Sequence, residues 1–194
     1  MDEIYTGKRV YLKRLKEHHI DERYVSWFEN KELLKYYSGS KQKYTRDYLI
    51  EDLIIGEKTG SHFVYGIFLK SSDLLIGNVK VGPIIQVHNI TDLSLIIGDQ
   101  DCHGKGLAIE AFKLGNHVTF EVHGIRKISS GMYADNKSSY YSLCKADWVI
   151  EGRRKGHYLV DGKPMDQVLV SSFNPHFYSL NKIKDEFSNN KFEE

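Results

Sequence analysis

Cysteine is scarce in this sequence, and its two thiols, Cys102 and Cys144, are too few for a disulfide framework. A chain of 194 residues, 41% of them hydrophobic, can bury one core without cross-links. The composition therefore suits a reducing compartment. Cys102 lies in a glycine-containing loop, but the local sequence fixes no base beside it. A small loop residue is thus favoured over an activated nucleophile.

An excess of charge of one sign and a long apolar run are also absent. The formal net charge is +1 at pH 7, which provides no basic face of the kind that nucleic acid requires. No apolar run approaches the roughly 20 residues of a membrane-spanning helix. The N-terminal Met1-Asp2-Glu3-Ile4 lacks the basic and then apolar pattern of a signal peptide. We expect a cytoplasmic protein with neither nucleic acid nor membrane as partner.

Spacings typical of metal ligands are missing as well. The nine histidines are scattered, and His18-His19 is the one adjacent pair. No HExxH pattern places two imidazoles on one helix face. The sequence therefore predicts no metal site.

What the chain does contain is a strand, a glycine loop and a helix in succession. The apolar run 93–97 precedes the loop Asp101-Cys102-His103-Gly104-Lys105-Gly106-Leu107-Ala108, and a helical pattern follows to Val122. The first turn of a helix leaves backbone N–H groups unpaired, and the helix dipole adds roughly half a positive charge there. Glycine lets an anion approach this backbone closely. The segment predicts a diphosphate site.

Hydrophobic periodicity predicts the remaining elements. Asp21 and Thr45 are expected to cap two helices, and Pro83 is expected to end a strand. The order of elements predicts a mixed α/β sheet in residues 1–173, followed by a polar tail, 174–194, that is either a surface helix or disordered. Strands are expected at 10–15, 63–69, 74–81, 92–97, 127–133, 148–159 and 165–173, and helices at 21–28, 32–37, 45–55, 107–122 and 137–145.

Four motifs in order resemble the GNAT superfamily of acyl-CoA-dependent N-acetyltransferases, in its RimJ/RimL-like branch. The loop with Gly104 and Gly106 is similar to the family's Q/R-x-x-G-x-G/A loop, and residues 136–152 resemble its N-x-x-S…K-x-G-F…E-G segment. Residues 7–12 and 27–32 look like the opening of the branch, and residues 151–166 look like its ending. The resemblance implies an α/β (α+β) fold: a mixed, mostly antiparallel central sheet, flanked by helices, whose central strands splay apart to form a CoA cleft.

The resemblance also implies which residues bind acetyl-CoA, the expected co-substrate. Backbone N–H groups of the loop would hold the diphosphate, with Lys105 either adding charge or remaining solvated. The preceding strand would bind the pantetheine arm and donate to the oxyanion. Asn136 would lie beside the pantetheine, cap the helix 137–145, or do both. The expected residues are Leu95, Ile96, Ile97, His103, Gly104, Lys105, Gly106, Leu107, Ala108, Asn136 and Ser139.

The catalytic groups are less clearly indicated, because the chain departs from the family pattern. Leu143 stands where members often carry a tyrosine as proton donor, so Tyr141 or solvent is expected to protonate the thiolate. Asp92 is the candidate base, either directly or through a water. It is alternatively an exposed strand-end residue, and a neutral amine needs no base. Asp101 replaces glutamine or arginine at the head of the loop, and Asp147 replaces a glycine.

The acceptor is expected to be a small-molecule amine. Residues 27–37 and 76–84 look like those of members that act on amino-sugar nucleotides in surface-polysaccharide synthesis. Protein N-termini are the close alternative, followed by polyamines and aminoglycosides. A non-catalytic acyl-CoA-binding module is the alternative from another class, and the aromatic content permits a homodimer. The candidate acceptor residues, each also plausible as core-edge or surface, are Tyr36, Tyr37, Lys80 and His88.

Overall fold

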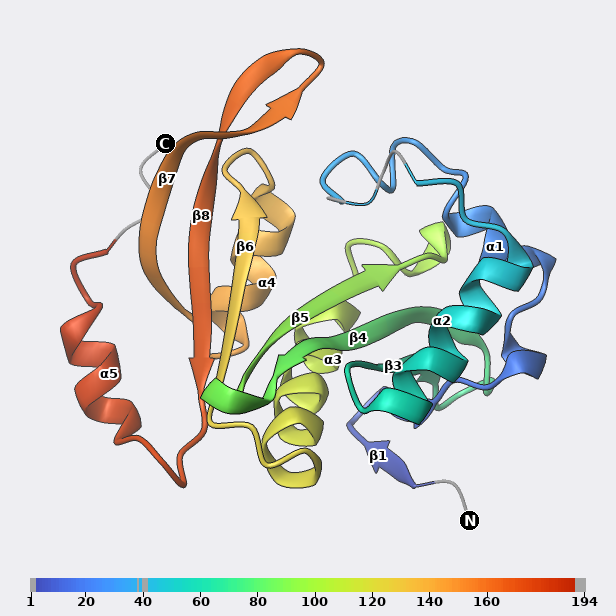
Figure 1. Ribbon diagram of the computed structural model, residues 1–194, viewed down its shortest axis with the longest axis horizontal. Coiled ribbons are helices and arrows are strands. Elements are labelled where there is room, and N and C mark those ends of the chain that lie inside the picture. The colour runs from blue at the N-terminus through green and yellow to red at the C-terminus, as the bar shows by residue number, and fades with distance from the viewer. Residues whose placement is uncertain (1–2, 38, 40–41, 191–194) are drawn as a thin grey trace.

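One eight-stranded sheet organises the computed structural model, which describes residues 3–37, 39 and 42–190 (Figure 1). Neighbouring strands are antiparallel except β5 and β6, which are parallel. The expected mixed, mostly antiparallel sheet is confirmed. In sheet order the strands are β1 (Ile4–Thr6), β2 (Val10–Arg14), β3 (Phe63–Leu69), β4 (Leu75–Ile85), β5 (Ile90–Ile97), β6 (Lys127–Tyr133), β8 (Lys163–Phe173) and β7 (Val149–Val160).

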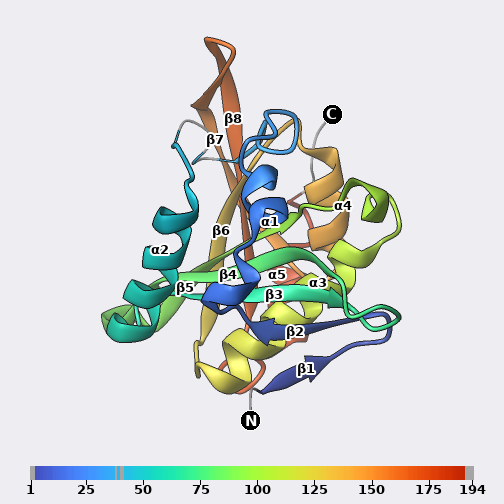
Figure 2. The ribbon, with the colours of Figure 1, turned by 90° about the vertical axis from the view of Figure 1, so that its right-hand side faces the viewer.

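Helices cover both faces of the sheet (Figures 1 and 2). Along β3, Tyr65 and Ile67 pack in the core that α3 and α4 cover, whereas Val64 and Phe68 pack in the core that α1 and α2 cover. Alternate side chains of a strand point to opposite faces, so an apolar run such as β3 is buried on both sides. The helices are α1 (Glu22–Trp27), α2 (Arg46–Thr59), α3 (Leu107–His117) with a π-helical extension (Val118–Val122), α4 (Lys137–Lys145) and α5 (Leu180–Glu186).

The start of α3 differs from the starts of α1, α2 and α4. Asp21, Thr45 and Asn136 cap α1, α2 and α4, each accepting a hydrogen bond from the backbone N–H three residues on, at 2.8, 3.2 and 3.1 Å. The N-cap of α3 is Gly106, and no side chain caps this helix. The first N–H groups of α3 are therefore available to a ligand.

Three local expectations differ from the structure. β4 continues past Pro83 to Ile85, because its pairing with β5 shifts register between Val81 and Ile84. A proline in such a bulge removes no ladder hydrogen bond. Residues 32–36 form turns and no helix. The three-residue strand β1, paired with β2, is too short for its pattern to have been recognised.

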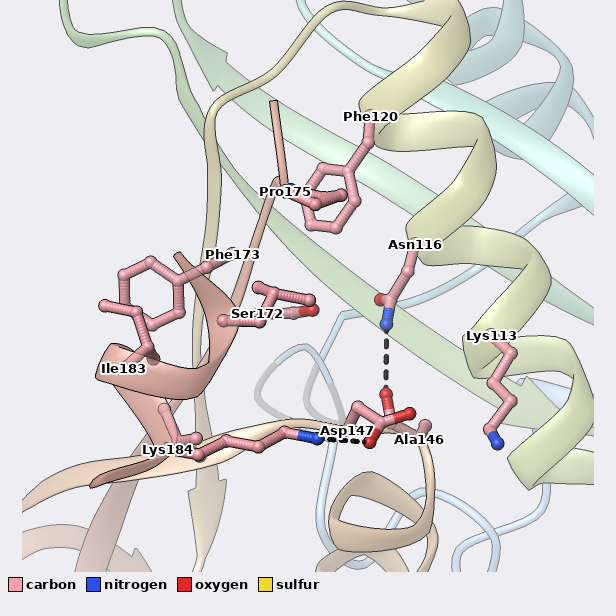
Figure 3. Close-up of a pocket in the computed structure, with 12 residues that line it drawn as sticks. Lys113, Asn116, Phe120, Ala146, Asp147, Ser172, Phe173, Pro175, Ile183 and Lys184 are labelled. Carbon is pink, nitrogen blue, oxygen red and sulfur yellow. Dashed lines mark hydrogen bonds and ion pairs between the residues drawn. The ribbon is translucent and has the colours of Figure 1, made fainter. Parts of the chain in front are cut away.

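The turn between α4 and β7 keeps its shape although Asp147 replaces the expected glycine. Asp147 has a φ of 65°, in the left-handed region that aspartate enters more readily than most residues. Its carboxylate lies 2.9 Å from Lys184 Nζ on α5. Figure 3 shows this pair beside a cavity of about 200 Å³ that Phe120 and Phe173 also line. Of the predicted domain 1–173 and tail 174–194, residues 1–2 and 191–194 lie outside the described part.

His123, which follows the π-helical turn, is largely buried against β3. Its ring stacks on Phe63, with ring centroids 4.3 Å apart, and its Nε2 lies 2.9 Å from the Tyr65 hydroxyl. Burial, together with the positive charge of Arg14, lowers the pKa of His123 to about 4. The unfolded chain protonates a histidine near pH 6.5. The neutral ring therefore contributes stability above pH 6.5, and this contribution is lost as the pH falls toward 4.

We expect the free energy of unfolding to decrease between pH 6.5 and pH 4, and to decrease less in His123→Gln. Glutamine cannot be protonated, yet its amide can still contact the Tyr65 hydroxyl. Urea unfolding followed by tryptophan fluorescence at several pH values measures both slopes. A variant whose pH dependence equals that of the wild type would show that His123 does not cause the loss.

Candidate active site

The two parallel strands in the middle of the sheet separate after a short paired segment. In the described part of the chain, β5 and β6 pair only at Ile90–Lys127 and Thr91–Ile128, and they diverge beyond this point (Figure 1). The Ser130 hydroxyl occupies the narrow end, where it contacts the Asp92 carboxylate and lies 3.1 Å from the Leu93 carbonyl oxygen. Farther along, no strand of the described residues pairs with the edge of β5 that faces β6.

A cavity of about 750 Å³ lies between β5, the start of α3 and α4. Every residue expected to bind the cofactor lines it: Leu95, Ile96, Ile97, His103, Gly104, Lys105, Gly106, Leu107, Ala108, Asn136 and Ser139. Other lining residues carry no signal that we recognised in the sequence, namely Glu32, Leu33, Gln100, Cys102, Ile109, Phe112, Ser138 and Ser142. Several of these are neighbours of predicted residues, so extending the motif along the chain could have found them.

The loop between β5 and α3 presents its backbone to this cavity. Gly104 and Gly106 have φ values of 69° and 70°, which glycine adopts at little cost. The His103 ring lies 2.7 Å from the Ile97 carbonyl oxygen and ties the loop to the end of β5. With the uncapped N–H groups of α3 and the positive end of its dipole, the loop is suited to a diphosphate.

Asp101 and Cys102 both have a structural explanation. Asp101 is exposed and does not line the cavity, while its neighbour Gln100 does. The negative charge at the head of the loop therefore lies outside the expected phosphate site. Cys102 lines the cavity and is buried. Burial and the nearby Asp99 carboxylate raise the pKa of its thiol, which disfavours the thiolate that a nucleophile requires.

α4 brings one phenol to the cavity. Asn136 caps this helix and also lines the cavity, so its two predicted positions are compatible. Tyr141 lines the cavity with 58% of its surface exposed. Tyr140 packs against the core, and Leu143 is buried. Tyr141 is therefore the tyrosine of α4 that can reach a ligand in this cavity.

Asp92 lies where β5 and β6 part, one residue beyond their last pair. Burial raises the pKa of Asp92, although the Ser130 hydroxyl and the Leu93 N–H oppose the shift. Burial chiefly, with a smaller contribution from the Asp92 charge, also raises the pKa values of Tyr37 and Tyr158. The carboxylate thus faces the aromatic side of the sheet, opposite α3.

Tyrosines from three separate segments surround this position. The rings of Tyr36 and Tyr133 have centroids 5.6 Å apart. Tyr133 stacks on Tyr158 at 3.9 Å, and the Tyr158 hydroxyl accepts a hydrogen bond from Gln167 Nε2 at 2.5 Å. Tyr36 and Tyr37 line the cavity. Tyr133 and Tyr158 had no local signal, because strand tyrosines are usually core residues.

The structure does not bring the other two acceptor candidates to the cavity. Lys80 Nζ lies 3.1 and 2.7 Å from the two carboxylate oxygens of Asp52 on α2. His88 is exposed in a 3-10 turn, Gln86–His88, at the opposite end of β5 from the glycine loop. Neither residue lines the cavity.

Among residues 3–37, 39 and 42–190, no three His, Cys, Asp or Glu side chains are grouped so that they could hold a metal ion. No helix within those ranges has the length and apolar character needed to cross a membrane.

Known proteins share both the sequence motifs and the fold. The family model described as acetyltransferase (GNAT) domain matches residues 9–146. The probable N-acetyltransferase YjcK of Bacillus subtilis (strain 168) is 27% identical over 175 residues, which cover 87% of this chain and 96% of that protein. The [ribosomal protein uS5]-alanine N-acetyltransferase of Escherichia coli (strain K12) is 29% identical over 119 residues, 61% of each protein.

A solved structure of an acetyltransferase has a similar fold. Spermidine N-acetyltransferase from Vibrio cholerae, in complex with CoA and spermine, superimposes with a TM-score of 0.79 and 16% identity. The match covers 88% of this chain and 99% of that one. The glycine loop, the parted strands and the family match agree, and the chain belongs to the GNAT family of acetyl-CoA-dependent N-acetyltransferases.

Proposed function

We propose that this enzyme acetylates the α-amino group of a peptide or protein N-terminus, with Asp92 as the base. The observation that carries this proposal is the position of Asp92, whose half-buried carboxylate faces tyrosines at the point where β5 and β6 part. A carboxylate beside aromatic faces attracts a single ammonium group. The named activity of the Escherichia coli relative, on the N-terminal alanine of a ribosomal protein, supports the same acceptor class.

The charges of the cavity lining, which does not include Asp92, Tyr133 or Tyr158, support this acceptor over the two competing classes. Lys105, at the glycine loop, is the one lysine or arginine among the described lining residues. An amino-sugar nucleotide, which we expected from the sequence, would need cations for its own diphosphate at the acceptor end. Among the described residues that line the cavity, Glu32 is the one carboxylate, whereas a polyamine carries several positive charges. A terminal amine needs neither additional cations nor several carboxylates.

The chain's residues divide the chemistry between the two sides of the sheet. Acetyl-CoA bound in the cavity would supply a thioester-activated acetyl group. The amides at the start of α3 would hold its diphosphate, and the free edge of β5 would hold its arm. Asp92 would accept the proton of the ammonium group, and Tyr141 would donate one at the sulfur end. Because burial raises the pKa of Asp92, this carboxylate is a stronger base than an exposed one.

An acceptor panel tests the proposal. The purified enzyme is given acetyl-CoA with peptides beginning in alanine, serine or methionine, with spermidine, or with UDP-linked amino sugars. Free thiol release and the mass of the product are measured. We expect a peptide to give the highest kcat/KM, with the acetyl group on its α-amine. A tenfold preference for spermidine or for an amino sugar would overturn the peptide assignment. If none of the acceptors tested caused release of free thiol, acetyl transfer itself would be overturned.

A further inference from the structure

Arg9, at the start of β2, binds the side of the glycine loop that faces away from the cavity. Its Nη1 donates to the Lys105 carbonyl oxygen at 2.7 Å, and its Nη2 donates to the Gly106 carbonyl oxygen at 3.1 Å. Arg9 does not line the large cavity. It borders a separate hollow on the other side of the loop, together with Lys8 and Lys70.

These two hydrogen bonds fix the direction of two peptide planes. In a trans peptide unit the N–H points opposite to the C=O. With the Lys105 and Gly106 carbonyls held toward Arg9, the N–H groups of Gly106 and Leu107 point away from it. Gly106 and Leu107 both line the cavity in which the diphosphate is expected. The guanidinium thus sets the orientation of the amides that an anion would contact.

Glu110, in the first turns of α3, holds Arg9 in this position. Its Oε2 lies 3.2 Å from Arg9 Nε, and its Oε1 accepts from the backbone N–H groups of Arg9 and Val10 at 2.6 and 3.1 Å. Burial opposes ionisation, but these N–H groups and the Arg9 charge outweigh it and lower the pKa of Glu110. The carboxylate therefore stays ionised, and it joins β2, the loop and α3 into one unit.

We propose that Arg9 is a positioning residue for the donor diphosphate, acting through the carbonyl groups of Lys105 and Gly106 and held by Glu110. This inference rests on the proposed binding of CoA at the start of α3, and it does not depend on which amine is acetylated. A planar guanidinium suits the task because its fork can donate to two acceptors at once, whereas a lysine ammonium cannot copy that geometry.

Binding of three ligands separates positioning from other roles. CoA and dephospho-CoA both carry the diphosphate, and only CoA carries the 3′-phosphate; pantetheine carries neither. We expect Arg9→Met and Arg9→Lys to bind CoA and dephospho-CoA at least tenfold more weakly, by the same factor. Pantetheine affinity should stay within twofold of the wild type. Calorimetry measures the two nucleotides, and an NMR titration measures pantetheine.

Lys8→Met is the matched control, since Lys8 borders the same hollow and its substitution removes one positive charge without touching the carbonyl hydrogen bonds. We expect little change in this variant. An equal loss in Lys8→Met and Arg9→Met would show a general charge effect and overturn the proposal. A loss confined to CoA would show direct contact with the 3′-phosphate, and an equal loss for pantetheine would show damage to the fold. Wild-type protein that binds none of the three ligands would instead refute CoA binding at α3.

Discussion

Asp92→Asn is expected to lower kcat/KM by roughly 10²- to 10⁴-fold, the usual contribution of a positioned general base. Asparagine keeps the size of the side chain and an oxygen for the Ser130 hydroxyl, but it cannot accept the proton of an ammonium group. The wild-type kcat/KM should rise with pH as Asp92 ionises. Because burial raises the pKa of this carboxyl, that rise should lie above the range of an ordinary aspartate. Initial rates across pH, with the acceptor peptide well below its KM, measure it.

In Asp92→Asn this rise should disappear, leaving only the rise at higher pH that belongs to the amine itself. Stability provides the control. A carboxyl with a raised pKa in the folded state contributes stability that is lost as the pH rises through that pKa, so the ionised group is a cost at neutral pH. The variant should melt at the wild-type temperature or above it. If the rise of kcat/KM on the acidic side of the pH profile were unchanged in Asp92→Asn, Asp92 would have no part in proton transfer.

Gly98→Ala is expected to lower the free energy of unfolding by about 3 kcal/mol, at the upper end of ordinary overpacking. A Cβ at Gly98 would lie 1.9 Å from an atom of the Trp27 ring. The ring is buried and packs on Tyr24, with centroids 5.1 Å apart. The Gly98 N–H is held by the Ile76 carbonyl oxygen at 2.8 Å. Neither the backbone nor the ring can therefore yield without losing contacts.

For a chain of this size the expected loss corresponds to a fall in Tm of roughly 6 to 12 °C. Thermal unfolding followed by circular dichroism measures the change. Gly152→Ala is the matched control, because a Cβ at Gly152 has no neighbour within 4 Å and its φ is not positive. If the Tm of Gly98→Ala equalled that of Gly152→Ala, α1 would have to move freely against β5.

Elements with local signals could be predicted from the sequence to the residue. β3, β6 and α4 have the expected bounds. The apolar run of β3 ends at the polar turn Lys70-Ser71-Ser72-Asp73, and Asn136 caps α4. The course of β4 past Pro83 could not be predicted in this way. It depends on a register shift against β5, and a register is a relation between two strands that neither strand encodes alone.

The same distinction separates the two halves of the site. Gly104, Gly106 and the start of α3 form one continuous segment, so their geometry follows from local backbone rules and was predictable. The proposed acceptor side is assembled from distant segments. Tyr133 and Tyr158 meet only because β8 pairs with both β6 and β7, and Lys80 binds an aspartate of α2. The Arg9–Glu110 pair spans 101 positions, and no sequence spacing indicates it.

The bare beginning of α3 has an energetic consequence for the free enzyme. A helix whose leading amides lack a protein partner gains its missing hydrogen bonds when an anionic nucleotide docks, so the loaded form is the more heat-resistant one. Mass action sets the size of that gain, about 2.7 kcal/mol at a nucleotide concentration one hundred times the Kd. The free energy of unfolding is therefore expected to rise with the concentration of the acyl donor.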